Sequence, residues 1–373
     1  MIARRAASMT WFPAVRVPAL RGGPVLRWGV LAPGVIAGDF TATVLANTDQ
    51  RVTAVASRSV ERAARFAARH GIGRVSESYE QLVSDPEVDV VYVAAPHSEH
   101  RALSLLAISA GKHVLIEKPI AVSAAEAEEI AAAARSAGVL AAEAMWTRYL
   151  PQFDVLHQVL ERGDFGSIRL ATADVGWRIG PDAPARFFDP AQGGGAALDM
   201  GVYGYWFAQF AIGRPVRIRA LGSMTDSGVD DQAVVALAGP DNRHASVTTS
   251  MSVTNSGLAA IHGTAGSARF LDPFVFPSRF VARIAGEVHE WRDTSGLTMR
   301  AGLAWQASAL AHFIAEGMTD SPWHSLDDAI SVMRTLDTVR HQLEGAHRAP
   351  PGEDTTLKRR ERHDGATAGL RPL

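Results

Sequence analysis

Short apolar runs alternate with helix-like segments in the first part of the chain. The runs are rich in valine, alanine and isoleucine, which is typical of strands buried on both faces of a parallel sheet. After the second run, Val60, Ala63 and Ala67 recur at helical spacing, and Gly71 follows where a helix would end. This rhythm predicts a doubly wound α/β domain of Rossmann type over residues 26–146. Its predicted strands span residues 28–32, 52–57, 88–95, 113–116 and 139–142.

The pattern changes after Pro151. A helical segment is followed by longer apolar runs, joined by turn sequences such as Gly239-Pro240-Asp241-Asn242. Two further helical stretches, residues 301–316 and 326–343, would cover the sheet that these runs form. A second domain is therefore predicted over residues 147–345, an α+β unit with a large, mostly antiparallel open sheet. Its predicted strands span residues 168–177, 216–223, 232–237 and 245–252.

Both ends of the chain lack such periodicity. Residues 1–25 carry four arginines and no acidic residue, and prolines and arginines interrupt every candidate core of a secretory signal. Arg4-Arg5 resembles a twin-arginine signal only weakly, so we expect a disordered extension, or a true start nearer Met9, and a cytoplasmic protein. The charged segment 346–373 is predicted to be a disordered tail. No run of 18 apolar residues indicates a membrane span.

Composition excludes several classes of function. The 373 residues have a formal net charge of −2 and no basic stripe, which argues against nucleic acid as a partner. The chain has no cysteine, so disulfides, thiolate metal sites and thiol catalysis are excluded. Its 13 histidines show no ligand spacing such as His-Glu-x-x-His, so we predict no metal site.

A glycine-containing turn, from Gly29 to Gly34, follows the first predicted strand. It is a variant of the dinucleotide fingerprint G-x-G-x-x-G/A in which Ala32 takes the first glycine position. A helix that begins there would direct backbone N–H groups, among them those of Val35 and Ile36, at a pyrophosphate. Taken alone, however, a glycine-containing turn after a strand is often just a tight turn that binds no cofactor.

The end of the second predicted strand bears on the choice of nicotinamide cofactor. An NAD site places an Asp or Glu about 20 residues after the turn, to bind the ribose 2′-hydroxyl. This chain has Ser57 and Arg58 there instead. A hydroxyl next to a guanidinium suits a 2′-phosphate, so NADP is predicted in preference to NAD. The alternative is that Arg58 caps the helix region and faces water.

Two segments at the ends of the next predicted strands supply further candidates for the cofactor site. Ala95-Pro96-His97, with His100 beyond it, follows the third strand, and Glu117-Lys118-Pro119 follows the fourth. Ligands of open α/β sheets bind outside the carboxyl ends of the strands, so both segments are predicted to lie where nicotinamide and substrate meet. A solitary Glu-Lys-Pro could also be a solvated loop.

A second motif, Asp199-x-Gly201-x-Tyr203, follows the glycines at 193–195 about 80 residues after Lys118. Asp199 and Tyr203 are four residues apart in a predicted helix, hence on one face and able to address one site. A tyrosine that acts as a base at neutral pH needs a nearby cation, which Lys118 could provide. In isolation, Tyr203 would more simply be an interior aromatic residue.

Taken together, these segments resemble the glucose-fructose oxidoreductase, inositol dehydrogenase and rhizopine-catabolism (Gfo/Idh/MocA) family over about residues 26–343. Within it, residues 26–30, 143–149, 193–203 and 228–231 look like the branch of dimeric trans-dihydrodiol dehydrogenase and NADP-dependent D-xylose 1-dehydrogenase. The resemblance implies a Rossmann domain, a C-terminal domain whose open sheet often forms a homodimer interface, and a cleft between the two.

The resemblance also implies roles for individual residues. Lys118 would contact the nicotinamide ribose and the substrate hydroxyl, Tyr203 would be the general acid and base, and Asp199 would orient substrate hydroxyls. Trp146 and Arg148 would line the substrate pocket, although Trp146 could equally belong to the core. The chain departs from the family pattern at three positions, namely Ala32, Ala95 and His97.

The function expected from these motifs is reversible hydride transfer between NADP and a ring carbon that bears a hydroxyl. Pyranoses such as D-xylose or D-glucose, aromatic trans-dihydrodiols and related cyclic polyols all fit this chemistry. Two alternatives stay open at this stage. One is a sugar oxidoreductase that keeps its cofactor tightly bound, and the other is a non-catalytic regulatory protein that binds the cofactor.

Overall fold

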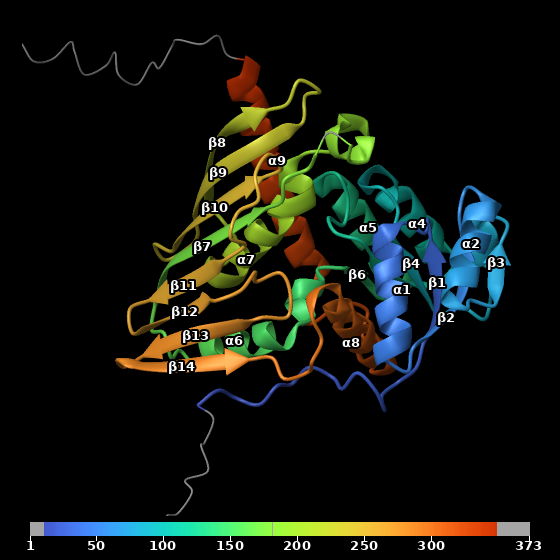
Figure 1. The fold of residues 1–373 in the computed structure, drawn as a ribbon, viewed down its shortest axis with the longest axis horizontal. Coiled ribbons are helices and arrows are strands. Elements are labelled where there is room, and N and C mark those ends of the chain that lie inside the picture. Colours follow the sequence, from blue (N-terminus) through green and yellow to red (C-terminus); the bar gives the residue numbers. More distant parts are fainter. Residues whose placement is uncertain (1–10, 181, 349–373) are drawn as a thin grey trace, which may run out of the picture.

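Two β-sheets, each with its own helices, make up the fold (Figure 1). This computed structural model describes residues 11–180 and 182–348. The first sheet has six strands in the order β3-β2-β1-β4-β5-β6, and every neighbouring pair is parallel. The predicted doubly wound α/β fold is therefore confirmed. The strands are β1 (Arg27–Leu31), β2 (Arg51–Ala56), β3 (Arg74–Ser76), β4 (Val90–Val93), β5 (His113–Ile116) and β6 (Ala141–Glu143).

Local sequence explains where helix α2 (Val60–His70) begins and ends. Ser59 caps its first turn by accepting a hydrogen bond from the backbone N–H of Arg62. Gly71 follows the last turn in the left-handed conformation, at φ 68°, so the predicted end of this helix is confirmed. The other helices of the domain are α1 (Val35–Asn47), α3 (Tyr79–Val83), α4 (His100–Ser109) and α5 (Ala124–Ala137).

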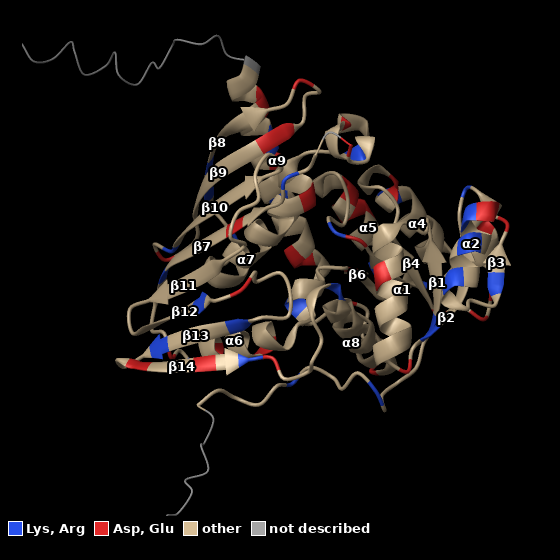
Figure 2. Cartoon of the chain, viewed as in Figure 1, with Lys and Arg blue, Asp and Glu red and all other residues tan. Residues whose placement is uncertain are grey.

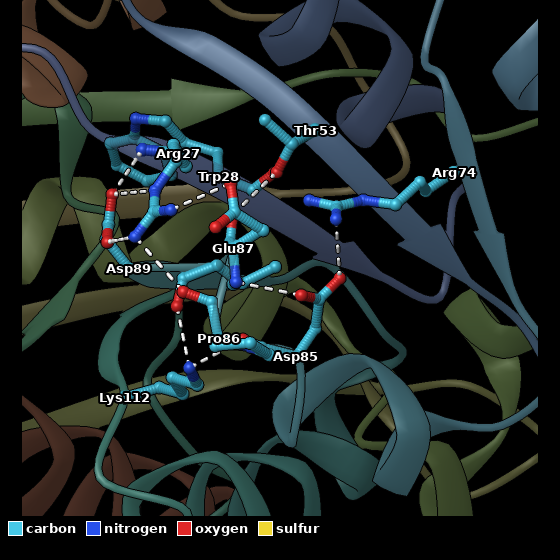
Figure 3. A network of polar contacts seen from close by, with 10 residues as sticks. Arg27, Trp28, Thr53, Arg74, Asp85, Pro86, Glu87, Asp89 and Lys112 are labelled. Atoms are coloured by element: carbon cyan, nitrogen blue, oxygen red, sulfur yellow. Dashed lines mark hydrogen bonds and ion pairs between the residues drawn. The ribbon is translucent and has the colours of Figure 1, made fainter.

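A polar network joins the amino ends of β1, β4 and β5, opposite the edge of the sheet where ligands of this fold bind (Figure 3). Arg27, the first residue of β1, donates to both carboxylate oxygens of Asp89 and pairs with Glu87 at 3.0 Å. Lys112, just before β5, donates to the carbonyl oxygen of Asp85 at 2.7 Å. The network thus fixes the loop before β4 against the two neighbouring strands.

Eight strands form the second sheet, in the order β14-β13-β12-β11-β7-β10-β9-β8. Only β7 and β10 are parallel neighbours, so the predicted mostly antiparallel sheet is confirmed. Sequence patterns predicted β7 to β10 but missed β11 to β14. The strands are β7 (Ile168–Gly176), β8 (Arg217–Met224), β9 (Asp230–Ala238), β10 (His244–Ser250), β11 (Ala259–Gly263), β12 (Gly266–Phe270), β13 (Arg279–Ile284) and β14 (Glu287–Arg292).

Helices α6 (Pro151–Glu161), α7 (Val202–Ile212) and α9 (Leu326–Arg348) lie on the face of the second sheet that is turned toward the first domain (Figure 1). Their aromatic side chains fill the core between helix and sheet, where Phe153 stacks on Phe270 at 5.2 Å between ring centroids. Helix α8 (Ala304–Ala315) packs instead against α1 of the Rossmann domain. The two domains therefore share an extensive interface.

The structure corrects the expectation of a disordered extension for residues 11–25. Phe12 is buried, and the ring of Trp11 stacks on that of His289 in β14 at 4.9 Å. Arg16 pairs with Asp154 of α6 at 3.0 Å. Further along, the segment reaches the Rossmann domain, where Arg21 donates to Asp49 at 3.0 Å. Contacts of single residues hold this segment along an extended path. Such contacts leave no periodic pattern in the sequence, so the sequence analysis missed them. Residues 1–10, including Arg4-Arg5 and Met9, lie outside the described residues.

At the other end, α9 continues through Arg348, so residues 346–348 are helical rather than part of a disordered tail. The rest of the predicted tail, residues 349–373, lies outside the described residues. In the part of the chain that is described, no helix combines the length and apolar character needed to cross a membrane. The same part contains no group of three or more His, Asp or Glu side chains arranged to hold a metal ion.

Candidate active site at the carboxyl edge of the parallel sheet

The turn after β1 lies between β1 and β4, where the strand order changes direction. Ala32 adopts the left-handed conformation at φ 57°, and Gly34 immediately precedes α1. A Cβ at Gly34 would meet no atom within 4 Å, and Val35 is 78% exposed. Gly29, in contrast, lies inside β1, where a Cβ would approach the Leu82 side chain to 2.6 Å. Packing therefore explains Gly29, while the turn itself is open.

The start of α1 fits the pyrophosphate of a dinucleotide. Among the described residues, no side chain caps its first turn, so the N–H groups of Val35 and Ile36 are left for another acceptor. At the end of the neighbouring β2, Ser57 is buried and Arg58 is exposed, and Tyr79 lies beside Arg58. The open turn, the uncapped helix and the exposed guanidinium together fit NAD(P).

Two histidines tie the loop after β4 to its surroundings. Both ring nitrogens of buried His100 lie within 2.9 Å of carbonyl oxygens, those of Pro119 and Ala95. His97 donates through Nδ1 to the carbonyl oxygen of Gly193 at 2.9 Å. Burial lowers the pKa of His97 to about 3, so its ring is neutral. Pro96 lies between Ala95, which accepts from His100, and His97, so the loop is held against both the Lys118 loop and the second domain.

Glu117 and Lys118 follow β5 and have different surroundings. Glu117 is buried, and its two carboxylate oxygens accept hydrogen bonds from the Tyr92 hydroxyl at 2.5 Å and from the Lys118 backbone at 3.2 Å. Burial raises the pKa of Glu117. The Lys118 side chain reaches across to the second domain, where Nζ donates to the carbonyl oxygen of Asp199 at 2.6 Å. Glu117 therefore braces the backbone from which Lys118 extends.

Lys118, Asp199 and Tyr203 meet at this point. Lys118 Nζ lies 3.5 Å from Asp199 Oδ1 and 5.1 Å from the centroid of the Tyr203 ring. The side chains of Lys118 and Asp199 retain 14% and 17% exposure. Two motifs that are about 80 residues apart in the sequence thus form one cluster between the two domains, partly open to solvent.

A buried carboxylate fixes the helical segment that carries Asp199 and Tyr203. Asp230, at the start of β9, accepts a hydrogen bond from the backbone N–H of Ala197 at 2.6 Å. Residues Ala197–Gly201 form a π-helical turn that leads directly into α7. Gly195 adopts φ 108°, and a Cβ there would lie 2.3 Å from the Asp230 carboxylate. The glycines at 193–195 therefore permit the tight approach that their sequence predicts.

The charges in the cluster depend on one another. Burial disfavours the ammonium form of Lys118, but the negative charge of Asp199 outweighs this effect and raises the pKa of Lys118. Burial likewise disfavours the Asp199 carboxylate, but the charges of Lys118 and Arg186 hold its pKa below the usual range. Burial raises the pKa of Tyr203, and the positive charge of Lys118 opposes the rise. At neutral pH the cluster therefore holds an ammonium, a carboxylate and a neutral phenol.

The segment after β6 places Trp146 and Arg148 apart from each other. Trp146 donates through Nε1 to the Tyr203 hydroxyl at 2.9 Å. The Arg148 guanidinium lies instead 5.6 Å from the ring of Phe210 and 6.0 Å from that of Trp323, and burial lowers its pKa to about 10. The structure thus joins Trp146 to the cluster, whereas Arg148 packs against Phe210 and Trp323, and its pocket role stays a prediction.

Two family models match this chain. One, described as an oxidoreductase family with an NAD-binding Rossmann fold, matches residues 26–144, and the other, the GFO/IDH/MocA C-terminal domain, matches residues 153–269. The chain belongs to the Gfo/Idh/MocA oxidoreductase family. It is an oxidoreductase with an NAD(P)-binding Rossmann domain, as the sequence motifs predicted.

Among curated relatives of this Gfo/Idh/MocA chain, trans-1,2-dihydrobenzene-1,2-diol dehydrogenase of Homo sapiens is 37% identical over 328 residues, which cover 85% of this chain and 97% of the relative. The Mus musculus enzyme is 40% identical with the same coverage. A solved 3-ketoreductase from Actinomadura kijaniata in complex with NADP has a TM-score of 0.73 at 27% identity, covering 85% and 97% of the two chains. An aldose-aldose oxidoreductase from Caulobacter crescentus shares the fold, with a TM-score of 0.77 at 24% identity, covering 86% and 98%.

Two residues of this Gfo/Idh/MocA site escaped the sequence motifs. Arg186 lies 3.6 Å from Asp199 Oδ1 but belongs to a stretch without helical or strand periodicity. Asp230 belonged to a segment of family resemblance, but nothing in the sequence indicated that its carboxylate would hold the backbone of Ala197. Both contacts depend on how loops fold back, and the glycines at 193–195 were the one available hint.

Proposed function

We propose that this protein is an NADP-dependent dehydrogenase that oxidises a ring carbon bearing a hydroxyl, in a pyranose sugar or a cyclic trans-dihydrodiol, and that also catalyses the reverse reduction. The observation that carries the proposal is the meeting of Lys118, Asp199 and Tyr203 at the carboxyl edge of the Rossmann sheet. An ammonium and a phenol side by side are the groups that a hydroxyl needs when it gives up its proton.

Each side chain of the cluster has a task in this reaction. When bound, the cofactor supplies the nicotinamide carbon that exchanges hydride with the substrate. Tyr203 takes the hydroxyl proton during oxidation and returns it during reduction. The Lys118 ammonium stabilises negative charge on the tyrosine oxygen and on the substrate oxygen. Asp199 keeps Lys118 charged and accepts a hydrogen bond from a substrate hydroxyl.

The preference for NADP rests on the end of β2. Arg58 is exposed there and Ser57 precedes it, whereas no carboxylate occupies the position that would bind a 2′-hydroxyl. A guanidinium binds a phosphate dianion through charge-assisted hydrogen bonds. The Actinomadura kijaniata 3-ketoreductase, which shares the fold, was solved with NADP.

The substrate class rests on the curated relatives and on the chemistry of the cluster. Relatives at 36% to 40% identity are named for the oxidation of trans-1,2-dihydrobenzene-1,2-diol. Pyranoses such as D-xylose and D-glucose share the arrangement of neighbouring ring hydroxyls with that diol. We therefore propose cyclic vicinal diols as the class.

The outer face of the second sheet supports a homodimer as part of this proposal. The described helices pack on the opposite face (Figure 1). On the outer face, Leu221 and Val234 are cross-strand neighbours that are 76% and 59% exposed. Apolar side chains on an uncovered sheet favour association with a second copy. Light scattering should give the mass of a dimer, and Leu221→Arg should shift it toward that of the monomer.

The proposed activity is tested by measuring how much NADPH or NADH the purified protein forms from NADP+ or NAD+, respectively, with a panel of pyranoses, inositols and dihydrodiols. Tyr203→Phe and Lys118→Ala should each reduce turnover roughly 100- to 10,000-fold. Tyr205→Phe is the matched control, because its buried hydroxyl has no hydrogen-bond partner among the described residues. Near-normal turnover in both Tyr203→Phe and Lys118→Ala would show that this mechanism is wrong.

The same preparation separates the proposal from its two alternatives. Ultraviolet absorbance and mass spectrometry of the purified protein reveal a nicotinamide that does not dissociate, as a hydride-shuttling sugar oxidoreductase requires. Cofactor binding without turnover across the whole panel would favour a non-catalytic role.

A further inference from the structure

Arg186 reaches the catalytic cluster from a third direction. It lies in a short 3₁₀ turn, Ala185–Phe188, between β7 and the π-helical turn that carries Asp199. This turn belongs to an excursion of the chain between the two domains (Figures 1 and 2). The guanidinium nitrogen Nη1 of Arg186 is 3.6 Å from Asp199 Oδ1, and the Arg186 side chain is 36% exposed. Arg186 is thus a cation on the open side of the cluster.

The backbone around Arg186 is held in place. The N–H of Gly195 donates to the Phe187 carbonyl oxygen at 3.0 Å, and the N–H of Gly194 donates to that of Asp189 at 2.9 Å. A Cβ at Gly194 would lie 2.8 Å from the Arg186 carbonyl oxygen, so only glycine allows this approach. The Arg186 guanidinium lies over the Phe187 ring, 4.0 Å from its centroid. The side chain is therefore positioned before any ligand binds.

The Asp199 carboxylate has three nitrogens near Oδ1, and only that of Lys118 comes within hydrogen-bond reach. They are Lys118 Nζ at 3.5 Å, Arg186 Nη1 at 3.6 Å and His97 Nε2 at 3.8 Å. Within the described ranges, the Arg186 guanidinium makes no hydrogen bond to protein. A carboxylate has about four acceptor sites, so Asp199 can accept further hydrogen bonds besides the one from Lys118, and the Arg186 guanidinium beside it still has donors to offer.

A hydroxyl group suits this pair better than a charged group. It can donate to Asp199 and accept from Arg186 at the same time. An anion would satisfy Arg186 but be repelled by Asp199, and an ammonium would have the opposite conflict. Because Asp199 Oδ1 lies beside Lys118 Nζ, which faces the reacting oxygen, the hydroxyl in question belongs to a neighbouring carbon.

We propose that Arg186 is a specificity-determining residue that contacts substrate and, with Asp199, binds the hydroxyl on the carbon next to the one that is oxidised. This inference rests on the proposed dehydrogenase function and deepens it. The pair selects vicinal diols over substrates with a single hydroxyl. Lys118 and Tyr203 act on the reacting oxygen, and Arg186 and Asp199 hold its neighbour.

The test compares substrates that differ in one hydroxyl, D-glucose with 2-deoxy-D-glucose and trans-1,2-cyclohexanediol with cyclohexanol, using NADP+ and the full chain. The wild type should favour the diol of each pair. Arg186→Gln should lower kcat/KM for the diols roughly 10- to 100-fold, the effect expected for one hydrogen bond to a charged group. It should change kcat/KM for the single-hydroxyl partners less than about threefold and leave NADP+ binding unchanged. Arg186→Lys keeps the positive charge but loses the paired N–H donors of the guanidinium. Its kcat/KM for the diols should therefore lie between those of the wild type and of Arg186→Gln.

Arg178→Gln is the matched control, because Arg178 is an exposed arginine just after β7 whose side chain makes no hydrogen bond or ion pair in the described part of the chain. It should behave like the wild type. Equal losses on both members of a pair, or a wild type without preference for the diol, would contradict the role of Arg186 alone. A wild type that oxidises neither these four compounds nor any other member of the panel of pyranoses, inositols and dihydrodiols would contradict the proposed function, and the inference with it. Thermal unfolding of each variant shows whether a loss of kcat/KM comes from misfolding. If Arg186→Gln is misfolded, the kcat/KM values of Arg186→Lys decide whether Arg186 has the proposed role.

Discussion

Trp146 Nε1 donates a hydrogen bond of 2.9 Å to the hydroxyl oxygen of Tyr203. Trp146 lies just after the last strand of the Rossmann sheet and Tyr203 in the first turn of α7, so the bond crosses the domain boundary. Both side chains are buried. Because the tyrosine oxygen accepts from the indole, its own hydrogen is left for a substrate oxygen. The bond also favours the deprotonated form of Tyr203.

Removing this donor should slow oxidation. Trp146→Phe keeps an aromatic ring near Tyr203 but loses the N–H, and a hydrogen bond of this kind contributes about 1 kcal/mol. We expect kcat for oxidation to fall roughly 5- to 10-fold, with NADP+ binding unchanged. Trp305→Phe is the control, because its Nε1 has no hydrogen-bond partner among the described residues. Equal kcat values for the two variants would show that the Trp146 hydrogen bond plays no part in proton transfer.

The rate of oxidation should rise with pH. Burial raises the pKa of Tyr203, so the phenol is protonated at neutral pH and the basic form becomes more abundant as pH increases. The pKa of His97 is lowered by burial to about 3 and that of Asp199 lies below its usual range, so neither titrates between pH 5 and 9. Steady-state kcat should therefore climb from about pH 7 upward for oxidation and fall at high pH for reduction. An inflection near pH 6 would instead indicate a histidine in the rate-limiting proton transfer, or protonation of Asp230, whose pKa burial raises to about 6 and which holds the backbone of Ala197.

Cofactor preference should depend on Arg58. Arg58→Asp puts a carboxylate where an NAD site carries one, and it would repel a 2′-phosphate while accepting from a 2′-hydroxyl. We expect the Kd for NADP+ to rise at least 10-fold and that for NAD+ to stay equal or fall, as measured by fluorescence titration. Arg69→Asp, at the far end of α2, makes the same change of charge away from the end of β2. A parallel loss for both cofactors in Arg58→Asp would rule out contact with the 2′-phosphate.

The cluster could be predicted from the sequence because its members follow regular elements. Lys118 comes directly after a buried strand, and the carboxyl ends of parallel strands share one edge. Asp199 and Tyr203 precede and begin a helix at a spacing that turns both toward one point. Family resemblance then joined the two motifs. None of these steps needed the geometry of a loop.

The parts that sequence analysis missed depend on loops and on contacts between single side chains. Arg148 was expected to line the pocket, together with Trp146, because both match the active-site segment of the branch that the chain resembles. In the 3₁₀ turn Trp146–Tyr149 their spacing of two residues does not keep the two side chains on one side, and Arg148 packs on Phe210 and Trp323. Arg186 lies 13 residues before its partner Asp199 in an irregular stretch. Strands β11 to β14 are short, with mixed burial, and their alternation is weak.

The segment 11–25 gives the last prediction, because its order rests on few anchors. Phe12 retains only 9% exposure and packs edge-on against Phe280 of β13, at 5.3 Å between ring centroids. Phe12→Ala would leave a cavity between the segment and the second sheet. We expect it to lower the free energy of unfolding by about 3 kcal/mol, at the low end for such truncations, because the site lies at the edge of the sheet.

Val15→Ala is the matched control in the same segment, because Val15 is 44% exposed and its truncation leaves no cavity. It should change stability by less than about 0.5 kcal/mol. Urea unfolding followed by tryptophan fluorescence measures both variants, and the m-value checks that the folded state exposes no more surface than before. A loss in Phe12→Ala as small as that in Val15→Ala would mean that the segment detaches from the sheet in solution and that the two domains hold together without it.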